Sequence, residues 1–99
     1  MAAMLIRHRV ADFAAWLPAF TAESPVRRAH GARQERVLRS ATDPDEVLVL
    51  LEWDDLDRAR LYADSDDARI AMWQAGVIGQ PDIWLLLEIG ESHPQEALP

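Results

Sequence analysis

The stretch that decides the fold is EVLVLLEW, residues 46–53, in which an unbroken apolar run lies between two glutamates. In a β-strand alternate side chains point to opposite faces of the sheet. Val47, Val49 and Leu51 would therefore lie on one face, and the two leucines between them on the other. An antiparallel strand with one wet face should instead alternate apolar and polar residues. The stretch predicts a strand that is covered on both faces.

The last predicted strand, residues 81–89, repeats this pattern with WLLL at its centre. Leaving about five such side chains in water, at ~1.5 to 3 kcal/mol each, would cost as much as the whole stability of a small domain. A second copy packed sheet to sheet about a two-fold axis is the simplest cover. The sequence therefore predicts a homodimer, and Trp84 is expected in its interface.

The chain begins with a predicted strand over residues 4–10, which places His8 on the same face as Met4 and Ile6. Asp12 can cap the helix that follows, because its carboxylate accepts orphan backbone N–H groups. That helix carries apolar residues at helical i, i+3, i+4 and i+7 spacing, and Pro18 predicts a kink or a loosely wound first turn. The apolar residues are Phe13, Trp16, Leu17 and Phe20.

The middle of the chain alternates helix and strand signals. Ser24 and Pro25 suit the cap and first position of a short helix that ends at Gly31. Residues 33–39 alternate as a strand, and the turn residues 42–45 predict a hairpin with residues 46–53.

Two capping signals follow that hairpin. Asp54 and Asp55 predict the start of one helix, and residues 65–67 predict the start of another. The first would turn Leu56, Ala59 and Ala63 to the core, and the second Ile70, Trp73 and Val77.

The predicted order is strand, helix, strand, strand, helix, strand, an α+β ferredoxin-like βαββαβ arrangement with helices on one side of an antiparallel sheet. Residues 1–90 are expected to form one domain, and residues 91–99 a flexible C-terminal tail.

Composition excludes several classes of function. The 99 residues contain no cysteine, so disulfides, thiolate nucleophiles and iron–sulfur clusters are ruled out. A net charge of −7 makes nucleic acid an unsuitable partner, and no apolar run is long enough to span a membrane. The three histidines lack metal-site spacing, and the aspartates at residues 54–67 suit helix capping better than Ca²⁺ or Mg²⁺. We expect a cytoplasmic protein with no metal.

Three stretches resemble the dimeric α/β-barrel superfamily, and within it the antibiotic-biosynthesis monooxygenases and polyketide cyclases. They are VADFAAW at 10–16, EWDDL at 52–56 and AGVIGQP at 75–81. The resemblance covers residues 4–89 and implies a dimeric α/β barrel. The superfamily holds many activities, so function must be argued from the site.

The resemblance gives only part of a catalytic set. Cofactor-free monooxygenases of this group use Trp, Tyr and Asn, and the chain has Trp53, Trp73 and Tyr62 but no asparagine. Haem-degrading relatives bind iron through a helical histidine, which residues 66–75 lack. Cyclase relatives use acid–base histidines, and His8 is the one histidine on a predicted core strand. No cofactor is expected.

The candidate catalytic residues are therefore His8 and Tyr62. His8 would be an acid–base group, because an imidazole titrates near neutral pH, and Tyr62 would be a proton donor. Trp16, Phe20, Trp53 and Trp73 are the candidate substrate-binding residues. Each has a structural alternative, because a backbone carbonyl can satisfy His8, Tyr62 can lie at an edge, and core packing alone explains the aromatic residues.

Two functions fit these residues. One is a small cofactor-independent enzyme, cyclase- or monooxygenase-like, that binds an aromatic or polyketide-like molecule between helices and sheet. This hypothesis requires a cavity of several hundred Å³ beside His8. The alternative is a non-catalytic dimer that binds a small hydrophobic ligand or another protein.

Overall fold

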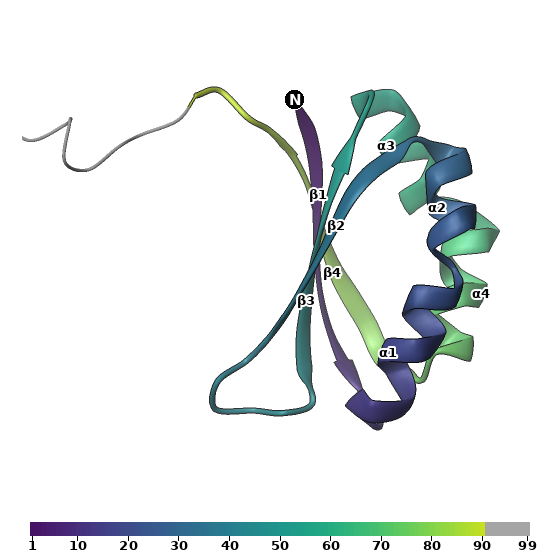
Figure 1. Ribbon diagram of the computed structural model, residues 1–99, viewed down its shortest axis with the longest axis vertical. Coiled ribbons are helices and arrows are strands. Elements are labelled where there is room, and N and C mark those ends of the chain that lie inside the picture. Colours follow the sequence, from purple (N-terminus) through teal and green to yellow (C-terminus); the bar gives the residue numbers. More distant parts are fainter. Residues whose placement is uncertain (91–99) are drawn as a thin grey trace, which may run out of the picture.

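The computed structural model describes residues 1–90, and the tail expected at 91–99 lies outside this range. A four-stranded antiparallel sheet in the order β2-β3-β1-β4 is covered by helices on one face only (Figure 1). This is the predicted α+β ferredoxin-like arrangement. The strands are β1 (Ala2–Val10), β2 (Ala32–Arg39), β3 (Glu46–Trp53) and β4 (Val77–Leu87), and the helices are α1 (Phe13–Ala22), α2 (Ser24–His30), α3 (Leu56–Ala63) and α4 (Asp66–Gln74).

The core lies between the sheet and the helices. The inward residues of β1 alternate as predicted, and Met4, Ile6 and Val10 are buried. Val47, Val49 and Leu51 on β3 have no exposed surface at all. The two central strands thus supply the apolar floor on which the helices pack.

The other face of the sheet is also apolar, and no element of the described chain covers it (Figure 1). The strand register places one set of apolar side chains side by side there. Leu38, Trp84 and Leu86 are 53%, 42% and 41% exposed. The set, here called the outer face, is Leu5, Leu38, Leu48, Leu50, Trp84 and Leu86.

Helices α1 and α2 follow each other almost directly. Asp12 caps α1 by accepting a hydrogen bond from the Ala14 N–H, as predicted, and Pro18 lies inside the helix. The role expected of Ser24 was wrong, because Ser24 is the first residue of α2 and makes no cap bond. Its hydroxyl instead donates to Glu35 on β2.

Helix α4 corrects the expected orientation of its apolar residues. Ser65 caps it as predicted, but Ile70 and Trp73 are 52% and 78% exposed. The inward face carries Ala68 and Met72 instead.

Strand β4 begins at Val77, earlier than the predicted residue 81, and Val77 is not part of the preceding helix. The strand pairs with β1 through Val77 and Ile78 and again from Asp82, with a bulge between these segments opposite His8. Gly79, with φ of +71°, and Pro81 lie in the bulge. Both residues suit a bulge, because glycine accepts a positive φ and proline has no N–H for the ladder. They obscured the strand in the sequence.

Two left-handed glycines offer a matched test of local packing. A Cβ on Gly31, with φ of +119°, would lie 2.4 Å from Asp54 Oδ1, whereas one on Gly79 would meet nothing within 4 Å. We expect Gly31→Ala to lower the free energy of unfolding by about 3 kcal/mol and Gly79→Ala by about 1 kcal/mol. Urea denaturation measures both. Equal losses would contradict this account of Gly31.

Candidate functional site

A small cavity lies between the helices and the inner face of the sheet. Its walls come from both halves of the chain and are mostly apolar. The free volume is about 30 Å³, room for about two water molecules. With its mouth and the gaps between atoms the hollow encloses about 400 Å³, but most of that is too narrow for a ligand. The lining residues are Ile6, His8, Trp16, Ala19, Phe20, Glu23, Arg27, Val49, Leu51, Tyr62, Ala71, Met72 and Ala75.

His8 borders this cavity from β1. Its side chain is buried, and neither Nδ1 nor Nε2 has a hydrogen-bond partner among the described residues. Burial lowers the pKa of His8 to about 4, because the charged imidazolium loses its hydration. At neutral pH the ring is therefore uncharged. The backbone carbonyl that would have made His8 purely structural is not there.

An aromatic stack forms the wall beside His8. The Trp16 ring meets the His8 ring edge to face at 5.5 Å and stacks on Phe20 at 4.9 Å, both between ring centroids. Phe13 extends the stack on the other side of Trp16 at 5.8 Å. The helical spacing that predicted a core-facing helix thus also places Trp16 and Phe20 at the cavity.

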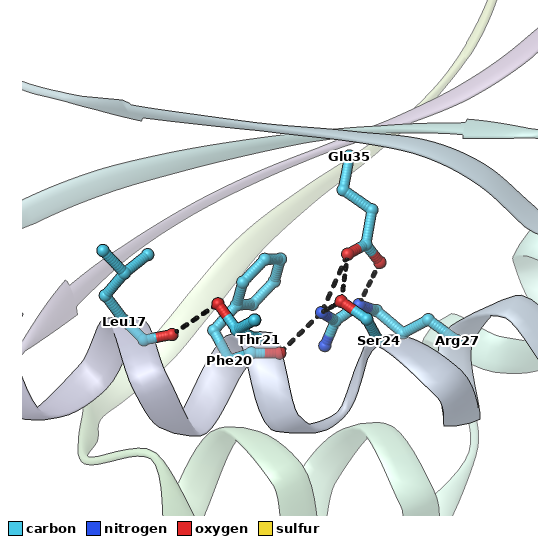
Figure 2. Close-up of polar contacts among 6 residues, drawn as sticks. All are labelled: Leu17, Phe20, Thr21, Ser24, Arg27 and Glu35. Atoms are coloured by element: carbon cyan, nitrogen blue, oxygen red, sulfur yellow. Dashed lines mark hydrogen bonds and ion pairs between the residues drawn. The ribbon is translucent and has the colours of Figure 1, made fainter.

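Arg27 is a site residue that sequence reasoning missed. It is 3% exposed and lines the cavity from α2. Its Nε donates to Glu35 Oε2 at 2.5 Å, and its Nη2 donates to the Phe20 carbonyl at 2.6 Å (Figure 2). The guanidinium carbon also lies 3.7 Å from the centre of the Phe20 ring. These contacts tie the junction of α1 and α2 to strand β2.

Glu35 balances the charge of Arg27. Burial alone would raise the pKa of Glu35, but the hydrogen bonds from Arg27 and Ser24 outweigh it and hold the pKa below its ordinary value. Glu35 occupies an inward position of β2, since it pairs with the buried Leu51. A carboxylate at a core-facing register position requires a buried cation, so Glu35 points to Arg27 once the pairing of β2 with β3 is known.

Tyr62 lies at the same end of the cavity as Arg27. It is buried on α3, and its ring packs against Trp53 at 5.4 Å and His30 at 5.0 Å between centroids. Burial raises the pKa of the Tyr62 hydroxyl, while the nearby charge of Arg27 acts in the opposite direction. The hydroxyl therefore stays protonated over the physiological range and can donate a hydrogen bond.

The structure separates the two remaining candidates from the cavity. Trp53 is buried behind Tyr62, does not line the cavity, and its indole N–H has no partner among the described residues. Trp73 lies on the solvent side of α4 and cannot line a pocket under the helices. Of the six predicted site residues, the cavity joins His8, Tyr62, Trp16 and Phe20.

The cavity is smaller than the several hundred Å³ expected. The aromatic stack and Met72 fill the space that a ligand of this class would occupy. Small residues also line the cavity, namely Ala19 on α1 and Ala71 and Ala75 on and just after α4. A ligand must therefore displace flexible side chains, of which Met72 is the most adaptable.

A second, more open hollow lies where β4 bulges away from β1. Its free volume is about 340 Å³, and it is lined by Arg7, His8, Arg9, Glu46, Ile78, Gly79, Gln80 and Asp82. Its arginines are already paired, Arg7 with Asp82 at 2.7 Å and Arg9 with Asp43 at 2.6 Å. Despite its size, this exposed and polar hollow suits an apolar ligand less well than the enclosed aromatic cavity.

Residues 1–90 hold neither a cluster of metal ligands nor a membrane-spanning helix. No group of three or more His, Asp or Glu side chains within residues 1–90 could hold a metal ion. No helix in this part of the chain is long and apolar enough to cross a membrane.

The fold is that of the antibiotic biosynthesis monooxygenases. One such monooxygenase superposes with a TM-score of 0.68 at 13% identity, over 91% of this chain and 100% of that chain. SnoaB, a cofactor-independent oxygenase from Streptomyces nogalater, gives 0.72 at 14% identity over 91% and 94%. Rv0793 from Mycobacterium tuberculosis gives 0.68 at 15% over 93% and 98%. At the level of fold, these confirm the resemblance read from the sequence. No protein-family model and no curated protein matches the chain.

The lowered pKa of His8 predicts how stability depends on pH. Below pH 6.5 the unfolded chain binds a proton at His8, and the folded chain does not. The free energy of unfolding therefore falls as the pH decreases toward 4. We expect His8 to cost about 2–3 kcal/mol of the free energy of unfolding at pH 4.5 relative to pH 7.5. The His8→Phe variant should lack this part of the pH dependence. Parallel curves of unfolding free energy against pH for the two proteins would show that His8 keeps its ordinary pKa.

Proposed function

We propose that the chain is a cytoplasmic, cofactor-independent enzyme of the monooxygenase-like kind, which acts on an aromatic, polyketide-like molecule in the cavity between helices and sheet. The observation that carries this proposal is His8. Its two ring nitrogens are buried beside the cavity without a protein partner. Leaving such groups unsatisfied costs about 1–3 kcal/mol each, so their retention favours a role with a bound molecule.

His8 would act as the acid–base group. A neutral imidazole accepts a proton from a phenol or from the acidic carbon next to a carbonyl. The resulting anion is the electron-rich state needed for reaction with O₂, and an intramolecular cyclisation begins with the same step. Because the site is dry, the imidazolium and the anion would stabilise each other as an ion pair.

The other residues would hold the substrate and complete the proton transfer. Trp16 and Phe20 offer flat aromatic surfaces against which a ring can stack. The protonated Tyr62 hydroxyl would donate to an oxygen of the substrate. The similarity in fold to SnoaB supports oxygenation over cyclisation, with the chemistry argued from the residues.

The outer face supports a homodimer as the working form. Three of its six apolar side chains are more than 40% exposed in the single chain. Packed against a second outer face across a two-fold axis, they would form the apolar centre of an interface of ordinary size, about 800 Å² per partner. The alternative of a non-catalytic binding module would need the same dimer but no proton transfer.

Leu50→Glu tests the dimer. Leu50 lies in the middle of the outer face, next to Arg36 on β2. The new carboxylate can pair with Arg36 in a single chain but would be buried in the dimer, so we expect the dissociation constant to rise at least about 100-fold. Sedimentation velocity measures it, with Ile70→Glu on the exposed side of α4 as the control. A wild-type protein that sediments as one subunit at micromolar concentration would refute the dimer.

His8→Gln tests the enzyme. The probe is anthrone, and in this reaction one anthrone and one O₂ give one anthraquinone and one water. Turnover is measured by the uptake of oxygen and by the change in absorbance. Gln can hydrogen-bond but cannot take up the proton, so we expect turnover to fall about 100-fold or more. The acid limb of the wild-type rate should lie near pH 4 rather than 6.5, because burial lowers the pKa of His8.

The matched control for His8→Gln is His30→Gln, since His30 lies outside the cavity lining and pairs with Asp67. Anaerobic hydrogen–deuterium exchange at the acidic carbon of anthrone isolates the proton transfer from the oxygen step. Binding of anthrone without exchange or turnover would favour the non-catalytic alternative. Equal turnover by the His8→Gln variant would remove His8 from the mechanism.

A further inference from the structure

The cavity between helices and sheet is too small for an organic ligand as it stands. Its free volume is about 30 Å³, whereas an apolar cavity that binds benzene has a volume of about 150 Å³. A ligand can therefore bind only if a side chain of the wall gives up the space that it fills. The residue that moves then decides how large a ligand the site accepts.

Most of the apolar wall is held in place by its neighbours. Trp16 contacts His8 and Phe20 in the aromatic stack, so none of these three rings can turn without breaking the stack. The other large side chains are buried against the sheet or against another ring, namely Ile6, Val49, Leu51 and Tyr62. Moving any of them would disrupt the core itself.

Met72 is the exception among the large apolar residues of the wall. It comes from α4, is only partly buried, and neither projects from the sheet nor belongs to the aromatic stack. An unbranched methionine side chain has three rotatable bonds and adapts to irregular spaces. Its neighbours Ala71 and Ala75 have no long side chain that could move aside. Met72 can therefore change its shape at the smallest cost to the rest of the core.

The helix that carries Met72 is also anchored less firmly than its neighbours. The one fully buried residue of α4 is Ala68, whereas α1 buries Trp16 and α3 buries Tyr62. The larger apolar residues of α4, Ile70 and Trp73, face solvent. Segments with few buried apolar contacts open locally at a lower free-energy cost than the rest of a protein. The α4 side of the cavity therefore yields more readily than the sheet or α1.

We propose that Met72 is the residue that determines ligand size in this cavity. In the free protein its side chain fills the space of the ligand, and the room gained by displacing it sets the largest molecule that the site accepts. This inference rests on the proposed function for the location of the ligand. It adds the residue that selects the ligand and the property on which selection acts, which is volume.

NMR of protein labelled with ¹³C at its methionine methyl groups observes the displacement without requiring turnover. The chain has three methionines, and Met4 is an internal control, because it is fully buried in the same core but does not line the cavity. The probes are benzene and 1,3,5-trimethylbenzene, which share one ring, carry no polar group and differ in volume. We expect both probes to shift the Met72 signal and to leave the Met4 signal nearly unchanged.

Three variants separate size selection from simple packing. Met72→Ala removes the displaced atoms, Met72→Leu keeps a similar volume with a less flexible side chain, and Ile70→Ala is the control on the exposed side of α4. In the wild type and in Ile70→Ala, we expect trimethylbenzene to bind about tenfold more weakly than benzene, because the larger probe forces Met72 further aside. Met72→Ala should abolish this difference, and Met72→Leu should widen it to about 100-fold.

A residue that only packs the core would tolerate leucine with no change in the relative affinity of the two probes. Thermal unfolding by circular dichroism checks that the variants fold. If Met72→Ala does not fold, the methyl signals of the wild type and the relative affinities in Met72→Leu decide.

Each outcome separates this inference from the proposed function. Binding of both probes with an unshifted Met72 signal, or the same relative affinity in the wild type and the Met72 variants, overturns the role of Met72 and leaves His8 chemistry untouched. Size selection in a protein that never transfers a proton supports the role of Met72 and overturns the enzyme. Failure of both probes to bind to the wild type and to Met72→Ala overturns the cavity as a ligand site, and with it both proposals.

Discussion

Strands that are apolar on both faces impose the main constraint on this molecule. The alternate residues of β3 are either fully buried under the helices or part of the outer face, and none of its five central positions is polar. The helices can cover only one face, because both helical connections cross on the same side of the sheet (Figure 1). The same constraint therefore shapes a core with a cavity on one side and an apolar surface on the other. The second copy that we propose would complete the structure.

The strands could be predicted because their signal is strong and local. Apolar runs and alternation located β1, β2 and β3 to within two residues. The predicted core face of helix α4 and the predicted start of β4 were wrong for different physical reasons. The buried residue of α4 is Ala68, which carries little hydrophobic signal, while Trp73 carries a strong one and faces outward. In β4, Gly79 and Pro81 in the bulge give the sequence the composition of a loop.

The candidate site was only partly visible in the sequence. The alternation of inward and outward residues along β1 placed His8 on the core face, and helical spacing placed Trp16 and Phe20 above it. Arg27 could not be found in this way, because an arginine in a short helix with exposed neighbours has the pattern of a surface residue. Only the register of β2 brings Glu35 beneath it, and register depends on pairing between distant segments. Polar groups buried by tertiary contacts therefore need the fold before they can be recognised.

The bulge in β4 also bears on whether further strands can add to the sheet. Strand β4 is an edge of the sheet, and an open edge invites further strands to add by backbone hydrogen bonding. Pro81 offers no N–H, and residues 79–81 depart from the straight line that an incoming strand would have to follow. Growth along the edge, which leads to fibrils without a natural end, is thereby interrupted. The two-fold pairing that we propose uses the outer face instead, and such a pair is closed and cannot grow further.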